Sequence, residues 1–178
     1  MTQFKIEIVS DVMCPWCVIG YKNLESALEQ LQNTISADIS WHAFELNPGM
    51  PKEGQNLAEH IMQKYGQTKS QSEENRAHLT QLGQQVGFDF NFDDNSIMIN
   101  SFDCHRLLTW AKEFNKQTEL KLALFKAHFS DKVYLNDQTA LLKVVSQVGL
   151  DAEEAKVILE SNAYSEAVET EENQMQQL

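Results

Sequence analysis

Proline, cysteine and long apolar runs are all scarce in this chain of 178 residues. There are three prolines, and none follows Pro51. There are also only three cysteines, which excludes a small domain held together by several disulfides. No apolar run approaches the ~20 residues of a membrane-spanning helix, so we expect no membrane partner.

Basic residues are also few, with 14 Lys and Arg against 26 Asp and Glu and a net charge of −12. A nucleic-acid partner would need a basic face, so this class of function is excluded. The first residues, Met1–Lys5, show no basic segment followed by a long apolar one, and we therefore expect a cytoplasmic protein. In that compartment a close cysteine pair is catalytic or redox-sensing rather than a permanent structural disulfide.

Two of the three cysteines, Cys14 and Cys17, are separated only by Pro15 and Trp16. The apolar run Phe4–Val9 predicts a short buried strand before them, and apolar residues at helical spacing predict a helix after them. A Cys-x-x-Cys pair at such a junction is the thioredoxin-type redox arrangement. The N–H groups at a helix start favour a thiolate at Cys14, so we expect it to be the nucleophile, with a pKa below that of a free thiol. Cys17 falls in register with the buried face of the helix and is the expected, less exposed, resolving thiol.

Other interpretations of this pair stay open. Half of a zinc site would need more ligands, which only Cys104 with His105, or His42, could supply. We favour redox chemistry and expect no metal. A purely structural disulfide would add little stability in so short a loop. Cys104 itself lies on the apolar stripe of a predicted helix, so it is either a small buried side chain or a third redox thiol.

Residues beside the pair are further candidates. Met13, Pro15 and Trp16 are expected to bind substrate by forming an apolar docking face, although Trp16 could instead only cover the disulfide. Asp11 could tune the thiols or relay protons. A turn-stabilising aspartate before a helix is an equally common alternative.

The string from Ser10 to Cys17, followed by Gly20 and Tyr21, resembles the FrnE branch of the DsbA-like disulfide oxidoreductases. The segment Asn100–Leu107 resembles the second recognisable segment of that branch, and the resemblance runs along nearly the whole chain. It implies an α/β, thioredoxin-like fold interrupted by a large all-helical domain. It also implies disulfide exchange with protein substrates through the cysteine pair, with no cofactor beyond its redox-active disulfide. Glutathione is a possible co-substrate.

The resemblance also places the second segment opposite the active site, so Asn100 and His105 become candidate substrate contacts. Two departures stand out: Cys104 occupies a position where a small residue such as alanine is more usual, and the later strand with a cis-proline has no counterpart. Two other functions remain. Kappa-type glutathione transferases and hydroxychromene-carboxylate isomerases share the fold but carry serine where Cys14 stands. A chaperone-like binding module that uses the helical domain is the third.

The chain divides into a βαβ half at 1–50, an inserted helical domain at 51–162, and a returning helix at 163–178. A second strand, Ile39–Leu46, is expected to lie parallel to the first. Helices are expected at Leu57–Tyr65, Ser70–Val86, Asn100–Phe114, Leu120–Phe129, Thr139–Val148 and Ala152–Leu159. Ser70 and Glu73 would form a capping box. We expect a closing hairpin and helix to be missing after Leu178, and therefore expect self-association through an open edge of the first strand.

Overall fold

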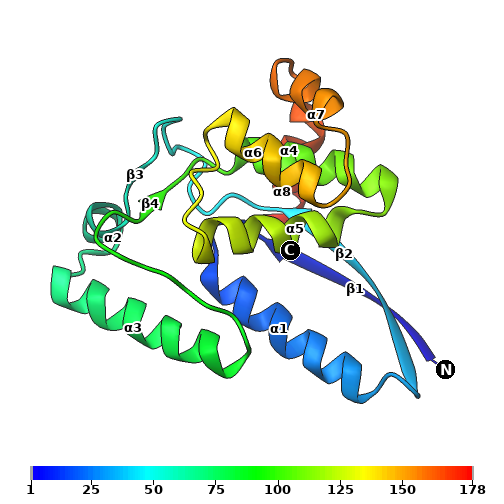
Figure 1. Ribbon diagram of the computed structural model, residues 1–178, viewed down its shortest axis with the longest axis horizontal. Coiled ribbons are helices and arrows are strands. Elements are labelled where there is room, and N and C mark those ends of the chain that lie inside the picture. The colour runs from blue at the N-terminus through cyan, green and yellow to red at the C-terminus, as the bar shows by residue number, and fades with distance from the viewer. Residues whose placement is uncertain (1, 178) are drawn as a thin grey trace.

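The computed structural model describes residues 2–177 (Figure 1). Strand β1 (Thr2–Ser10), helix α1 (Pro15–Gln30) and strand β2 (Ile35–Ala43) form a βαβ unit. The two strands are parallel, with Ser10 opposite Ala43, which confirms the predicted pairing. This register carries the end of β1, and with it the first cysteine, to the same edge of the sheet as the end of β2.

Two details of the predicted strands are wrong. The second strand begins four residues earlier than expected and ends at Ala43, because beyond that point the backbone N–H of Leu46 donates to the Asp11 carboxylate instead of to a strand. The first strand is not buried: Phe4 is 49% exposed. Among the described residues β1 pairs with β2 alone, so its other edge is open. Self-association at that edge stays a prediction.

The rest of the chain is mainly helical. A two-stranded antiparallel pair, β3 (Gln55–Asn56) with β4 (Ile97–Met98), flanks the first two of these helices. The helices and helical turns are α2 (Leu57–Tyr65), α3 (Lys69–Gln85), α4 (Phe102–Ala111), a 3-10 turn at Lys112–Phe114, α5 (Gln117–Phe125), a π-turn at Lys126–Ser130, α6 (Gln138–Gln147), α7 (Ala152–Leu159) and α8 (Ser165–Met175).

Helix ends follow local chemistry, with one correction. Helix α2 ends at Gly66, whose φ of 66° suits glycine. The expected capping box of α3 is displaced: Thr68 and Gln71, not Ser70 and Glu73, exchange the two hydrogen bonds. Both pairs fit the capping pattern, so spacing alone did not distinguish them.

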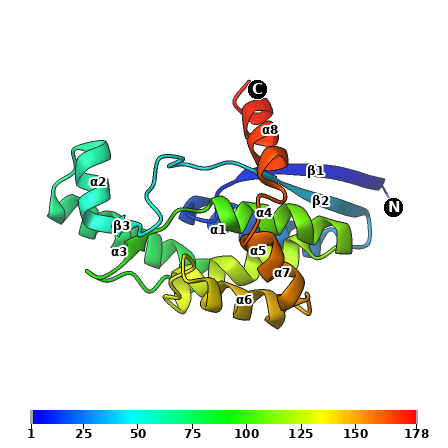
Figure 2. The ribbon, with the colours of Figure 1, turned by 90° about the horizontal axis from the view of Figure 1, so that it is seen from above.

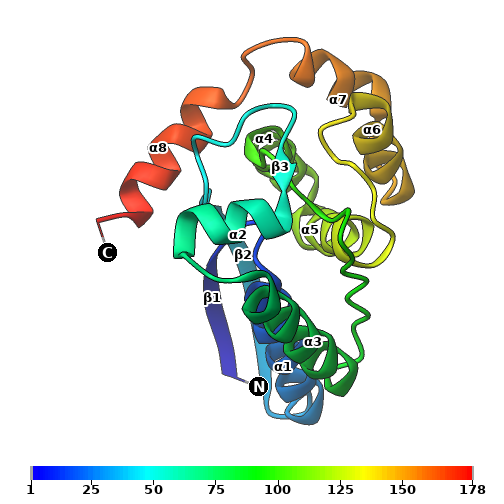
Figure 3. The ribbon, with the colours of Figure 1, turned by 90° about the vertical axis from the view of Figure 1, so that its left-hand side faces the viewer.

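The helices lie on both sides of the strand pair. Figure 2 and Figure 3 show α8 on one side of β1 and β2, and α5, α6 and α7 on the other. Trp41 of β2, which is 2% exposed, anchors the second side, since its indole N–H donates to Thr118 and its backbone exchanges two hydrogen bonds with the Gln117 side chain. On the first side, carboxylates of α8 accept the N–H groups of Ala43 and Glu45. The βαβ unit is thereby held against helices distant in sequence.

No helix within the described residues is long and apolar enough to cross a membrane. The division into three segments at residues 50 and 162 stays a prediction.

Candidate active site

Helix α1 begins directly at the cysteine pair. Cys14 is the N-cap residue and Pro15 follows in the first turn, where a missing N–H is not needed for the helix. The N–H of Cys17 donates to the carbonyl of Cys14 at 3.1 Å, which closes the turn. Both thiols are free and both are half-buried, so the expectation that Cys17 is the less exposed one stays a prediction.

The two cysteines differ instead in what they face. A cavity of about 580 Å³ is lined by Met13, Cys14, Pro15 and Trp16, but not by Cys17. Its walls come from the start of α1, from α2 and α3, and from residues 91–99 and 128–134. Figure 3 shows these helices around the start of α1. The structure therefore brings together four of the predicted site residues and places one of the two cysteines on the cavity wall.

The cavity is mostly apolar, and several of its apolar side chains are also exposed to solvent. These are Trp16 (55% exposed), Tyr65 (58%), Ile97 (39%) and Tyr134 (37%). Exposed apolar groups collected around a cavity mark a binding surface. Of these, the sequence pointed only to Trp16.

Three histidines that lie far apart in the sequence also line the cavity, namely His60, His78 and His128. Burial lowers the pKa of His128 to about 4, and burial together with Lys64 lowers the pKa of His60. These two imidazoles are therefore uncharged at neutral pH. The three histidines form no local motif in the sequence, and only the fold brings them to one cavity.

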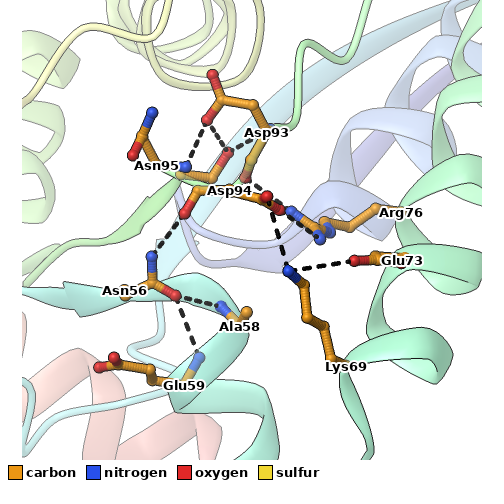
Figure 4. Close-up of polar contacts among 10 residues, drawn as sticks. Asn56, Ala58, Glu59, Lys69, Glu73, Arg76, Asp93, Asp94 and Asn95 are labelled. Carbon is orange, nitrogen blue, oxygen red and sulfur yellow. Dashed lines mark hydrogen bonds and ion pairs between the residues drawn. The ribbon is translucent and has the colours of Figure 1, made fainter.

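Charged side chains in the cavity wall are already paired (Figure 4). Arg76 donates to the carbonyl of Asp93 at 2.7 Å and lies 3.6 Å from the carboxylate of Asp94. Lys132 contacts the Asp93 carboxylate at 2.6 Å, and Asn56 donates to the carbonyl of Asp94. These bonds tie the loop at 93–95 to α2 and α3, and they leave little unpaired positive charge for an anionic ligand.

The electrostatics of the pair reverse one prediction. A hydrogen bond with Cys17, burial and the charge of Asp11 raise the pKa of Cys14. The same bond lowers the pKa of Cys17 to about 6, helped by the Ser10 hydroxyl and the charge of Lys121. The reason is local: the Cys14 side chain makes no hydrogen bond to the N–H groups at the helix start. The two thiols are therefore coupled through one hydrogen bond, which acts on their pKa values in opposite directions.

Asp11 is buried behind the pair. Its Oδ1 accepts the N–H of Met13 and lies 3.4 Å from Nε2 of His105, while its Oδ2 accepts the N–H of Leu46. Burial alone would raise its pKa, but His105 and the Leu46 N–H outweigh burial and hold the pKa at about 2. A carboxylate of such low pKa is a poor proton relay, so its contacts favour the turn-stabilising role.

The two candidate contacts taken from the second segment do not reach the cavity. His105 is 1% exposed and is engaged with Asp11. Asn100 bridges the Met50 carbonyl and the Phe102 N–H, one position before the N-cap Ser101. The His105 side chain contacts a buried carboxylate and the Asn100 side chain holds two backbone groups, so both support the site from outside the cavity and their substrate contact stays a prediction.

Two further observations concern Cys104 and the alternative of a zinc site. Cys104 is 1% exposed in α4, and burial together with Asp103 raises its pKa, so it stays a buried thiol. Within residues 2–177 no group of three or more His, Cys, Asp or Glu side chains is arranged to hold a metal ion.

The comparisons with known proteins agree with this geometry. The chain is 26% identical over 161 residues to the uncharacterized protein YwbO of Bacillus subtilis, covering 90% of this chain and 74% of YwbO. A probable DsbA oxidoreductase of Streptomyces coelicolor, SCO1869, superimposes with a TM-score of 0.89 at 30% identity, over 97% of this chain and 75% of that one. A 2-hydroxychromene-2-carboxylate isomerase shares the fold alone, with a TM-score of 0.69 at 15% identity over 95% of this chain and 77% of the isomerase. The model of the DSBA-like thioredoxin domain matches residues 5–178, and the chain therefore belongs to that family of thioredoxin-fold proteins.

Proposed function

We propose that this chain is a thiol–disulfide oxidoreductase that exchanges disulfides with protein substrates through Cys14 and Cys17. The observation that carries the proposal is the position of Cys14 at the wall of an apolar cavity that Cys17 does not line. A substrate sulfur in that cavity would meet Cys14 first. Cys17 would then act from behind as the resolving thiol.

The proposed reaction has two steps. The proton shared by the pair passes to Cys17, and the Cys14 thiolate attacks a substrate disulfide, whose bond breaks to release one substrate thiolate. Cys17 then passes its proton to the released substrate thiolate and attacks the Cys14 sulfur, which releases the second substrate thiolate and forms the Cys14–Cys17 disulfide. Two electrons move from the pair to the substrate. The reverse sequence oxidises a substrate dithiol.

The cavity favours an apolar polypeptide segment over glutathione as the main partner. Its lining is apolar, two of its histidines are uncharged, and Arg76 and Lys132 are already paired with acidic residues. Glutathione carries a net negative charge and two carboxylates, and it would have to compete for those two cations. We keep it as a small co-substrate that could reduce or oxidise the pair.

A non-catalytic binding function is the second candidate, favoured by the exposed aromatic side chains around the cavity. One comparison separates the two: reduction of insulin disulfides in a glutathione buffer, and suppression of aggregation of an unfolded protein. We expect the wild-type chain to accelerate insulin reduction, and a Cys14→Ser, Cys17→Ser double variant to lose this activity. A wild-type chain that suppresses aggregation but never reduces insulin would refute the oxidoreductase. Isomerase activity of the hydroxychromene-carboxylate type that survives in the double variant would also refute the proposed oxidoreductase function.

A further inference from the structure

Arg76 of α3 carries a buried donor that none of the contacts described above uses. The residue is 9% exposed and lines the cavity. Its Nη1 donates to the carbonyl of Asp93, and its Nη2 lies 3.6 Å from the Asp94 carboxylate (Figure 4). Its Nε is buried and has no hydrogen-bond partner among residues 2–177. A buried N–H without an acceptor costs free energy, so a donor kept in this wall calls for an acceptor that a ligand brings.

The surroundings of Arg76 decide which kind of acceptor fits. Its positive charge is already opposed by the Asp94 carboxylate, and Lys132, which also lines the cavity, is paired with Asp93 at 2.6 Å. A carboxylate ligand would add a further negative charge beside these two aspartates. The free Nε–H therefore suits a neutral acceptor better than an anion. Main-chain carbonyls are strong neutral acceptors, and every residue of a polypeptide carries one.

The imidazole of His128 adds two more polar atoms to the same cavity. It lies in the π-turn that follows α5, and its ring packs edge-on against Phe129 with the ring centroids 4.7 Å apart. Because this imidazole is uncharged at neutral pH, it offers one N–H donor and one acceptor nitrogen. A polypeptide main chain also carries one donor and one acceptor per residue. An uncharged main chain therefore matches the polar atoms of Arg76 and His128.

The cavity also has room for a short stretch of polypeptide. Its volume of about 580 Å³ falls within the range of ~300–1,000 Å³ that is typical of ligand sites. Its apolar walls, which include Trp16 and Tyr65, can take side chains, while Arg76 and His128 can meet the main chain. Cys14 lines the same cavity, so a polypeptide held there lies beside the proposed nucleophile.

We propose that Arg76 is a substrate-binding residue whose Nε–H donates to a main-chain carbonyl of a polypeptide in the cavity lined by Cys14. The inference deepens the proposed function and rests on it, because this polypeptide is the one whose disulfide Cys14 attacks. A hydrogen bond to the main chain does not depend on the side chain of the bound residue. The site therefore accepts polypeptides of different sequence, and its apolar walls favour apolar segments.

A peptide without cysteine tests this binding separately from disulfide exchange. The probe is a hexapeptide of alanine, leucine and phenylalanine with both ends blocked. A set of analogues replaces one backbone amide at a time by an ester, whose carbonyl is a weaker acceptor. Calorimetry measures the Kd of each peptide for the reduced wild type and for Arg76→Lys. Lysine keeps the positive charge near Asp93 and Asp94 but has no N–H at the position of Nε.

We expect Arg76→Lys to weaken binding of the parent peptide about tenfold, which corresponds to about 1.4 kcal/mol. One ester analogue should bind the wild type about fivefold more weakly than the parent peptide, and should bind Arg76→Lys as well as the parent peptide does. Each of the other esters should have the same effect on both proteins. The control is Lys69→Met, which removes an exposed cation 3.8 Å from the same Asp94 but outside the cavity. It should leave every Kd unchanged.

The ester analogues keep the test valid even if Arg76→Lys displaces the loop at 93–95. A displaced loop would weaken all peptides alike, so a set of esters in which no penalty depends on Arg76 would overturn the inference. A peptide that does not bind the folded wild type would overturn it too. S-methylglutathione, which carries carboxylates and cannot exchange disulfides, serves as the anionic comparison. If it binds the wild type more tightly than the peptide and loses that advantage in Arg76→Lys, the donor serves a carboxylate and the inference is wrong.

A second measurement uses the wild-type chain alone. The ¹⁵Nε–¹H resonance of Arg76 should move downfield, and its hydrogen should exchange more slowly with solvent, when the peptide is added. An unchanged resonance while the peptide binds would mean that water alone serves this donor, and would refute the inference. None of these measurements involves disulfide exchange, so the two proposals fail separately. A peptide-binding chain that cannot reduce insulin refutes the proposed function alone, and an insulin-reducing chain whose peptide affinity is indifferent to Arg76 refutes this inference alone.

Discussion

The two sides of the cysteine pair differ in kind. On the cavity side Cys14 faces apolar residues and two uncharged imidazoles, and the charged groups of the wall are neutralised by pairing. On the interior side, two buried charged residues, Asp11 and Lys121, lie near Cys17. In the proposed function this difference separates two tasks: the cavity side would bind a partner through apolar contact, and the interior side would hold the start of α1 and set the surroundings of Cys17.

The largest effect is expected on the interior side. Asp11→Asn removes the buried carboxylate that contacts His105 and weakens two backbone hydrogen bonds, and leaving a buried polar group unsatisfied costs about 1–3 kcal/mol. Urea unfolding at pH 7 measures this loss. Asp38→Asn changes an exposed aspartate of β2 and serves as the control, with an expected change within ~0.5 kcal/mol.

The same aspartate gives a pH dependence. Its pKa in the folded chain, about 2, lies below the ordinary value of 3.8, so its carboxylate adds stability above about pH 4. That contribution, about 2 kcal/mol, is lost as the pH falls from 4 toward 2. The stability difference between the wild type and Asp11→Asn should narrow over this range. A difference that stays constant from pH 7 to pH 2 would contradict the ionised, paired state of Asp11.

Local patterns in the sequence predicted much of this structure. The cysteine pair was placed at the right strand-to-helix junction, and α7 begins and ends at the expected residues, Ala152 and Leu159. Both depend on interactions within a few residues, which spacing and capping reveal.

The residues on the interior side of the pair could not be predicted from local patterns in the sequence. Asp11 meets His105, and Lys121 reaches the carbonyl of Ser10, only because α4 and α5 pack against the end of β1. No periodicity distinguishes a buried lysine from an exposed one. The lowered pKa expected for Cys14 is wrong for a related reason: a hydrogen bond with Cys17, burial and the charge of Asp11 raise this pKa, and the spacing of the motif reveals none of them.

A smaller effect concerns Glu45, which lies near the interior side, with a buried Oε1 that has no partner among the described residues. Burial and the charges of Glu172 and Asp11 raise its pKa to about 7, above the ordinary value of 4.5. The stability that this carboxyl contributes is present below about pH 4.5 and lost as the pH rises through 7.

Glu45→Gln should therefore stabilise the chain at pH 8 by about 1–2 kcal/mol and change little at pH 4. Thermal unfolding at the two pH values measures this difference. Glu53→Gln, at an exposed glutamate, should have no such pH-dependent effect. Equal effects of Glu45→Gln at both pH values would show that Glu45 is not a carboxyl of raised pKa.

The smallest effect is expected on the cavity side. Trp16→Ala removes an exposed ring that lines the cavity, so stability should change by less than ~0.5 kcal/mol. Loss of about 1 kcal/mol of apolar contact should raise the KM for insulin roughly fivefold. Phe4→Ala removes an equally exposed ring from β1, which does not line the cavity, and should leave KM unchanged. The same rise in KM in both variants would show that the cavity does not bind the substrate.

The division of labour between the two sulfurs is the central claim, and trapping of mixed disulfides tests it most directly. Cys14→Ser and Cys17→Ser proteins are each incubated with native insulin, whose disulfides are intact. Covalent complexes are then counted by mass spectrometry without reductant. Cys17→Ser should accumulate a complex through Cys14, because Cys14 faces the cavity and no resolving thiol remains. Cys14→Ser should accumulate almost none. A complex that forms equally in both variants, or mainly through Cys17, would contradict the account.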